Sequence, residues 1–122
     1  MKTATEIQAA LAHYYGTENY HRYSALFHNH LLTDGAKALA DMCQAYWLID
    51  VICSHHAQTK GEGFQVWKLT KEDSKATVTC GDGNGNELAK QDIPYTDFPL
   101  DEITLYCIEQ GDNWIILLTS EY

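Results

Sequence analysis

The hydrophobic pattern of the chain changes its period between Gly61 and Gly63. Before these glycines, apolar residues recur every three to four positions, which is the repeat of an amphipathic helix. After them, apolar and polar residues alternate, which is typical of strands with one buried face. A run of helices followed by a run of strands predicts an α+β fold rather than a parallel α/β fold.

Two helices are expected in the first half of the chain. Thr3 and Glu6 have the spacing of a capping box, and an apolar face follows them, so the first helix should cover residues 4–15. The second should cover residues 34–54, and its second half is apolar on nearly every side, as in a core helix. The segment between them, residues 17–32, is polar, aromatic and rich in histidine, and we expect it to be mostly irregular.

Five strands are expected in the second half, at residues 64–69, 76–80, 88–93, 103–109 and 114–119. The sequence Gly-Asp-Gly-Asn-Gly-Asn at positions 81–86 predicts a hairpin, because Asn-Gly accepts positive φ at low cost. It also resembles the start of a calcium loop, but Glu87 stands where that loop needs glycine. We predict a single domain, residues 1–122, in which two N-terminal helices precede a five-stranded antiparallel meander and the long helix packs on one face.

The basic residues are distributed unevenly. All eight Lys and Arg residues lie in the first 90 positions, whereas residues 91–122 carry seven carboxylates and no Lys or Arg. With a net charge of −9, such a chain attracts cationic partners and repels phosphate, so we expect direct binding neither to nucleic acid nor to membranes. We expect no leader peptide, because the first residues lack an apolar segment, and no apolar stretch is long enough to span a bilayer.

The four cysteines are far apart, and none forms a CxxC pair. We therefore expect buried thiols in a reducing, cytoplasmic setting. A structural zinc site is the alternative for one group, Cys53, His55 and His56, because thiolate and imidazole are zinc ligands. No recurring zinc spacing supports that site, and we expect no cofactor.

Asp50 is the least expected residue in the helical half. It lies seven positions after Cys43, which predicts that it is on or beside the buried face of the second helix. One interpretation is an acid or base with a raised pKa, lining a pocket with one or more of His28, His30, His55 and His56. The other is a structural carboxylate that accepts hydrogen bonds from a neighbouring side chain.

The acidic C-terminal third gives the main functional hypothesis. Carboxylates around an exposed aromatic ring can steer and anchor a basic partner surface. The candidate partner-binding residues are Asp97, Phe98, Asp101, Glu102, Glu109 and Asp112. The alternative to a partner-binding role is a solvated acidic surface that only keeps the protein soluble. The aromatic and histidine-rich residues 13–30 also leave two alternatives open, a recognition surface or a loop packed over the helix ends.

Several segments resemble an uncharacterised family of small bacterial and mobile-element proteins, a domain of unknown function. The most specific is Pro94-Tyr95-Thr96-Asp97-Phe98-Pro99-Leu100-Asp101, and others are Thr33-Asp34-Gly35, Phe64-Gln65-Val66-Trp67 and the run at positions 45–50. The resemblance implies a prokaryotic, phage or plasmid setting and no established activity. It carries over no catalytic residue.

Two functions from different classes are compatible with these patterns. The first is a small acidic protein that binds a basic surface of a host or phage protein, in its concrete form an inhibitor of a nucleic-acid-handling defence system. The second is a small enzyme or ligand-binding domain with a pocket around Asp50. No phosphate-binding loop, dinucleotide fingerprint or nucleophile elbow favours the second. A homodimer is expected if the apolar segment at residues 114–119 forms a sheet edge.

Overall fold

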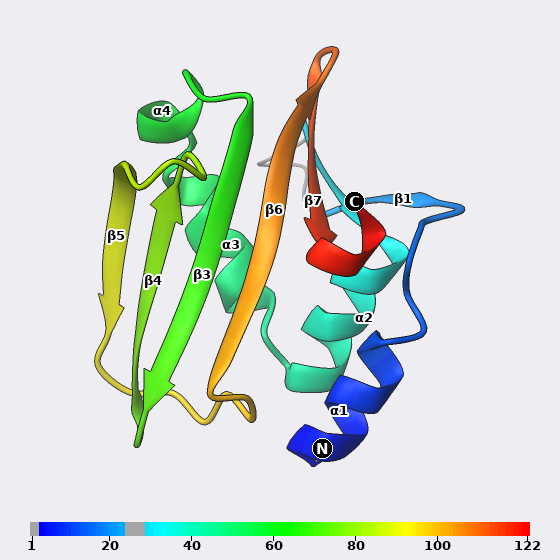
Figure 1. The fold of residues 1–122 in the computed structure, drawn as a ribbon, viewed down its shortest axis with the longest axis vertical. Coiled ribbons are helices and arrows are strands. Elements are labelled where there is room, and N and C mark those ends of the chain that lie inside the picture. Colours follow the sequence, from blue (N-terminus) through cyan, green and yellow to red (C-terminus); the bar gives the residue numbers. More distant parts are fainter. Residues whose placement is uncertain (1–2, 24–28) are drawn as a thin grey trace.

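The computed structural model describes residues 3–23 and 29–122 and places seven strands in one mixed sheet, with helices α2 and α3 behind it in Figure 1. The strands are β1 (Tyr20–Arg22), β2 (His30–Thr33), β3 (Phe64–Glu72), β4 (Lys75–Gly81), β5 (Glu87–Ile93), β6 (Glu102–Gln110) and β7 (Asn113–Leu118). The helices are α1 (Ala4–Leu11), α2 (Asp34–Cys43), α3 (Tyr46–Ser54) and α4 (His56–Thr59), and a 3-10 turn, η1 (Thr119–Glu121), follows β7.

The chain is α+β, but the predicted architecture of two N-terminal helices and a five-stranded antiparallel meander is wrong. The strand order is β1-β2-β7-β6-β3-β4-β5. The short strands β1 and β2 lie in the segment expected to be irregular, and β2 runs parallel to β7. β6 pairs with β3 rather than with β5, so residues 94–101 must cross the end of the sheet to connect β5 with β6.

β7 is an interior strand, between β2 and β6, so the expectation that it forms an apolar edge is wrong. Ile116 lies opposite Leu32 of β2 and Cys107 of β6. Every residue of β7 after Asn113 is buried. A strand buried on both faces is apolar at successive positions, which explains the sequence without a second copy of the chain.

The expected helix over residues 34–54 is interrupted. Gln44 has a φ of 50° and ends α2 in the left-handed conformation, and its N–H donates to the carbonyl of Ala40. The Ala45 N–H also donates to that carbonyl, at 2.9 Å. α3 then begins at Tyr46 with a new phase of its apolar face. The sequence does not reveal this break in the helix, because the apolar pattern continues across it.

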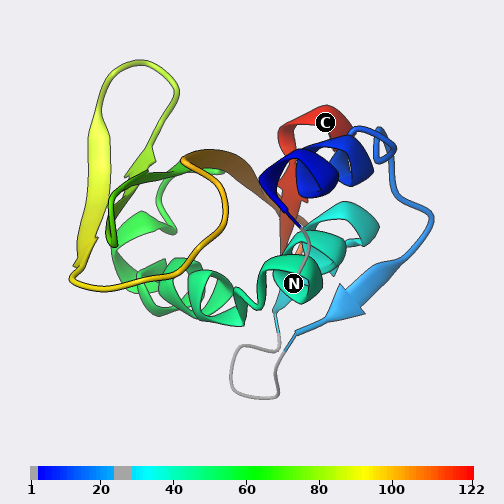
Figure 2. The same cartoon turned by 90° about the horizontal axis from the view of Figure 1, so that it is seen from below.

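The helices cover one face of the sheet. Figure 2 shows the sheet curving around α2 and α3, with α1 beside α2. The predicted capping box of α1 is confirmed, because Thr3 and Glu6 exchange hydrogen bonds between side chain and backbone N–H at 3.1 and 3.2 Å. Trp67, Leu105 and Leu118 lie side by side on three neighbouring strands and are all buried. Their side chains join the hydrophobic core that contains the apolar faces of the helices.

The four cysteines are free thiols and are buried, as the sequence predicted. Within residues 3–23 and 29–122, no helix is long and apolar enough to cross a membrane.

Candidate partner-binding surface

The crossing loop at residues 94–101 is fixed to the end of the β3–β4 hairpin. The Thr96 N–H donates to the carbonyl of Ser74 at 2.7 Å, and the Lys71 N–H donates to the carbonyl of Asp101 at 2.7 Å. The Thr96 hydroxyl also accepts from the Phe98 N–H at 3.1 Å. These bonds hold the loop in one conformation across the end of the core.

Alternate side chains of the loop point into the core. Thr96, Phe98 and Leu100 are buried, and the Phe98 ring meets Trp47 of α3 edge-on with 6.2 Å between ring centroids. The expectation that Phe98 is an exposed anchor is therefore wrong, since only 1% of its surface is accessible. The exposed aromatic side chain of this loop is Tyr95, with 74% of its surface accessible.

The outward side chains of the loop share one end of the molecule with the hairpin tip. We call this surface the acidic end; its carboxylates, all on exposed residues, are Glu72, Asp73, Asp97, Asp101 and Glu102. Basic side chains are fewer there. Lys68 lies 3.8 Å from Glu102, Lys75 is exposed on the hairpin tip, and Lys71 is half-buried. Tyr95 and the carboxylates thus form an acidic surface with an aromatic ring.

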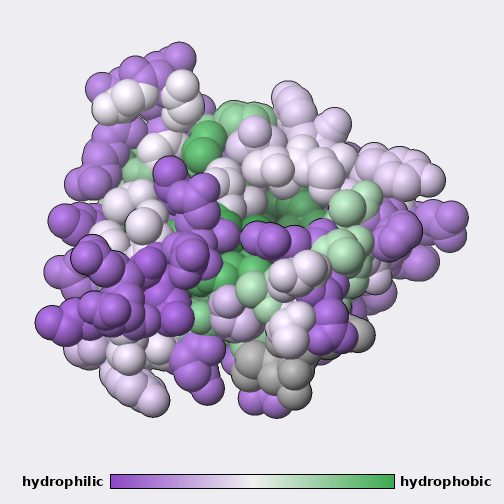
Figure 3. All heavy atoms as spheres, turned by 60° about the horizontal axis from the view of Figure 1, so that its bottom comes forward, coloured by the Kyte–Doolittle hydropathy of each residue, from purple (hydrophilic) through white to green (hydrophobic). Residues whose placement is uncertain are grey.

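Recesses adjoin both ends of the loop. One, of about 580 Å³, is lined by Pro94 and by hairpin residues that include Glu72, Asp73 and Lys75. The other, of about 170 Å³, is lined by Ile103 at the start of β6 together with Leu11 and Leu118. In Figure 3, which brings this end of the molecule forward, hydrophilic side chains surround a central hollow in which hydrophobic ones are visible.

The other two predicted partner-binding residues, Glu109 and Asp112, lie at the opposite end of β6, at its turn into β7. At about 3.3 Å per strand residue, Glu102 and Glu109 are roughly 23 Å apart. Both are exposed, but they cannot share a compact contact with the acidic end. The structure thus divides the predicted set into two surfaces.

Asp50 is not buried, and the expectation that it lies on the core side of the helix is wrong. The break at Gln44 resets the helix phase and turns Asp50 toward solvent. Its carboxylate accepts a hydrogen bond of 2.5 Å from the hydroxyl of Tyr23, which lies just after β1. Burial, together with this contact to the carboxylate, raises the pKa of Tyr23. Asp50 therefore matches the structural interpretation rather than a pocket acid.

The histidines proposed to act with Asp50 are held elsewhere. His55 contacts the side-chain oxygens of Gln58 and Gln91 through its two ring nitrogens, at 2.7 and 2.8 Å. His56 packs edge-on against the rings of His30 and Trp114, at centroid distances of 4.9 and 5.0 Å. His28 lies outside the described residues.

The alternative zinc group of Cys53, His55 and His56 is not assembled. Burial raises the pKa of the Cys53 thiol to about 12, which keeps it protonated. In the described part of the chain, no three His, Cys, Asp or Glu side chains are grouped so that they could hold a metal ion.

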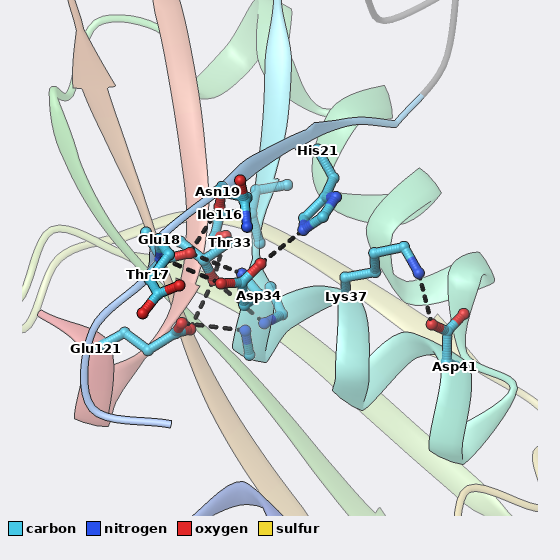
Figure 4. Close-up of polar contacts among 12 residues, drawn as sticks. Thr17, Glu18, Asn19, His21, Thr33, Asp34, Lys37, Asp41, Ile116 and Glu121 are labelled. Carbon is cyan, nitrogen blue, oxygen red and sulfur yellow. Dashed lines mark hydrogen bonds and ion pairs between the residues drawn. The ribbon is translucent and has the colours of Figure 1, made fainter. Parts of the chain in front are cut away.

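A polar network at the start of α2 was not predicted from the sequence (Figure 4). Glu121 of η1 accepts hydrogen bonds from the Thr33 hydroxyl at 2.6 Å, the Gly35 N–H at 3.0 Å and the Leu118 N–H at 3.0 Å. Asp34 accepts from the His21 ring at 2.7 Å, which lowers the pKa of that carboxyl. The network joins β1, α2 and η1, so its carboxylates hold the fold together.

The sequence analysis predicted only some of the residues of the acidic end. Tyr95 could have been found from its place between Pro94 and Thr96 in a loop where alternate residues are apolar. Glu72 and Asp73 lie between the two strands predicted at 64–69 and 76–80, and nothing local indicates that residues 94–101 cross beside them.

Comparison with known proteins identifies a family for nearly the whole chain. Residues 5–122 match a family of unknown function, DUF6876. The chain belongs to this family. The match confirms the resemblance to an uncharacterised domain that the sequence motifs indicated.

The fold also resembles a crystal structure described as a protein of unknown function from Enterococcus faecalis. The TM-score is 0.57 at 19% sequence identity, and the alignment covers 85% of this chain and 98% of that chain. At this identity, the likeness shows a shared fold and nothing about activity. No curated protein matches the sequence.

Proposed function

We propose that the protein acts by binding, and that its acidic end docks against a basic surface of another protein. One observation carries the proposal: Tyr95, Asp97 and Asp101 are exposed on a loop whose alternate residues are anchored in the core. The carboxylates would steer a cationic partner to this end, and the tyrosine would supply the central contact.

Rigid presentation favours this use of the loop. A loop that is ordered before it binds loses little conformational entropy on binding. The backbone bonds from Thr96 and Lys71, and the buried Phe98 and Leu100, meet that condition. The adjoining recesses could accept side chains of the partner, as expected for a contact with a packed centre and a polar rim.

The concrete form of the proposal is an inhibitor that occupies a groove normally filled by nucleic acid. Lys and Arg side chains that bind phosphates also bind carboxylates, so such a groove is the basic surface that fits best. A defence protein of a host cell met by a phage or plasmid would be a partner of this class. This setting rests on the family resemblance and on the acidic composition.

The test uses two variants with the same change in charge. D97K/D101K alters the acidic end, whereas E109K/D112K alters exposed carboxylates at the other end of β6. Each protein is immobilised, exposed to bacterial lysate and washed at two salt concentrations. The affinity of any captured protein is then measured by titration calorimetry, with and without a short DNA or RNA duplex as competitor.

We expect a partner that binds the native protein and E109K/D112K alike, but binds D97K/D101K at least about tenfold more weakly. Loss of binding in competition with the duplex would support the inhibitor form. Equal weakening by both variants would show that only net charge matters and would contradict a defined surface. Unchanged binding by D97K/D101K would reject the acidic end.

A further inference from the structure

The sheet has two edges of very different length. β1 forms one edge with three residues, and β5 forms the other with seven. Figures 1 and 2 both show β5 at the rim of the molecule. Its inner side pairs with β4 from Ala76 opposite Ile93 to Gly81 opposite Glu87, and within the described residues no strand pairs with its outer side.

Two features of β5 normally guard an edge against pairing. Lys90 is exposed in the middle of the strand, and Pro94 follows its last residue. However, Asp92 lies two positions from Lys90, so both side chains are on the same face of the sheet. This is the face without helices, because the alternate residue Ala89 lies beside the buried Cys80 on the helix side.

The alternating charges make one pairing with a second copy self-complementary. Two copies of β5 can form an antiparallel pair through a two-fold axis perpendicular to the sheet. This axis must lie level with a residue, because only then are directly opposite side chains on the same face of the joined sheet. With the axis at Gln91, Lys90 of each copy faces Asp92 of the other, and Ala89 faces Ile93. An axis at Lys90 or at Asp92 places like charges opposite each other, which is destabilising.

We propose that β5 pairs with β5 of a second copy of this chain, centred on Gln91, to form a homodimer with one continuous sheet. The two reciprocal Lys90–Asp92 contacts select this register. A contact built from one strand is at the small end of specific interfaces, so the dimer should dissociate on dilution. The inference is independent of the proposed function, since the antiparallel arrangement directs the two acidic ends toward opposite poles of the dimer.

The experiment is a charge exchange followed by sedimentation equilibrium over a wide range of protein concentration. K90D and D92K each bring like charges together, and we expect both to keep the monomer mass of 13.8 kDa where the native protein approaches twice that value. The dissociation constant of each single variant should rise at least about tenfold.

Two rescues make the test specific. In an equimolar mixture of K90D and D92K, each substituted position faces the opposite charge of the other chain, so a heterodimer should form. The double variant K90D/D92K should dimerise by itself for the same reason. R22D, on the opposite edge strand β1, and D112K, at the turn between β6 and β7, change exposed residues away from β5 and are matched controls that should leave the native equilibrium unchanged.

Circular dichroism of each variant verifies that the fold is retained. A native protein that stays at 13.8 kDa at every concentration would overturn the proposal and leave Lys90 and Pro94 as guards of the edge. Single variants that dimerise like the native chain would overturn it as well. If the acidic end binds no partner, the outcome of this dimerisation experiment does not change.

Discussion

The two sides of the sheet are held together in different ways. On the β3–β5 side, strands adjacent in the sequence pair through hairpins, from Glu72–Lys75 at one turn to Gly81–Glu87 at the next, with one shift in register between Cys80 and Gly81. On the β1–β2 side, a short ribbon depends on residues far along the chain: β7 for pairing and Glu121 for the start of α2. The first side distributes its stability over many similar bonds, whereas the second concentrates it in a few side chains. Single substitutions should therefore cost more on the β1–β2 side.

The largest effect should come from Gly35→Ala. A Cβ atom at this position would lie 2.5 Å from Glu121 Oε1 and 2.7 Å from Leu118 Cδ1. Glu121 would have to move and would lose its bonds from Thr33 and two backbone N–H groups. We expect the free energy of unfolding to fall by about 3 kcal/mol, measured by urea denaturation.

Two comparisons isolate the cause of that loss. Gly61→Ala, where nothing lies within 4 Å of the added atom, should change stability by less than about 0.5 kcal/mol. In the E121A background, Gly35→Ala should cost less, because the clash with the carboxylate is gone and only the clash with Leu118 remains. Equal costs in both backgrounds would contradict the clash.

Acid should weaken the β2 side next. Burial, aided by the neighbouring His56, lowers the pKa of His30 from 6.5 to about 4. Below pH 6.5 the unfolded chain binds this proton and the folded chain does not, so stability falls as the pH falls toward 4. The loss attributable to His30 should reach about 2 kcal/mol near pH 5.

The measurement is the unfolding free energy of the native protein and of His30→Gln between pH 7 and pH 5. The difference between the two curves should change by that amount, because other groups titrate in both proteins. Parallel curves would show that the His30 pKa is not depressed in the folded state.

A smaller effect is expected at the contact between β1 and α3. Tyr23→Phe removes the hydroxyl that bonds to Asp50 and to the Tyr46 carbonyl, and keeps the ring stacked on Tyr46. The exposed Asp50 carboxylate would be solvated by water instead. We expect a loss of about 1 kcal/mol in urea denaturation. A loss above about 3 kcal/mol would mean that Asp50 is not accessible to water in the folded state.

The smallest effect should come from the ion pair between Lys68 and Glu102 on the hairpin side. Both side chains are exposed and their charged atoms are 3.8 Å apart. Such pairs contribute little in water, so Lys68→Ala should leave the melting temperature unchanged within error. A marked decrease would contradict the view that this side distributes its stability.

The same contrast explains what the sequence could predict. The five strands of the second half were located because they alternate in polarity and follow turns with clear signals, as at Asn84-Gly85. The capping box of α1 is a local signal as well. The order of the strands was predicted wrongly, because residues 94–101 carry no local mark of a loop that crosses two strands.

The missed elements depend on distant contacts. β1 and β2 have three and four residues, too few to show a period, and β2 is fixed by Trp114 to Ile116. The break at Gln44 uses a left-handed residue that is usually glycine. At the candidate site, Asp97, Asp101 and Glu102 were placed together by their sequence, but the burial of Phe98 depends on the core beneath the loop.

The parallel pairing of β2 with β7 also determines how early the sheet can be completed during synthesis in the cell. Thr33 and its contact Ile116 are 83 positions apart, so β2 leaves the ribosome long before its neighbour is made. At about 5–20 residues per second, that delay is roughly 4–17 seconds. Throughout this interval the β2 edge of the β1–β2 ribbon has no strand to pair with it. The nascent chain therefore offers an apolar edge to chaperones, or to other nascent chains, until β7 is synthesised.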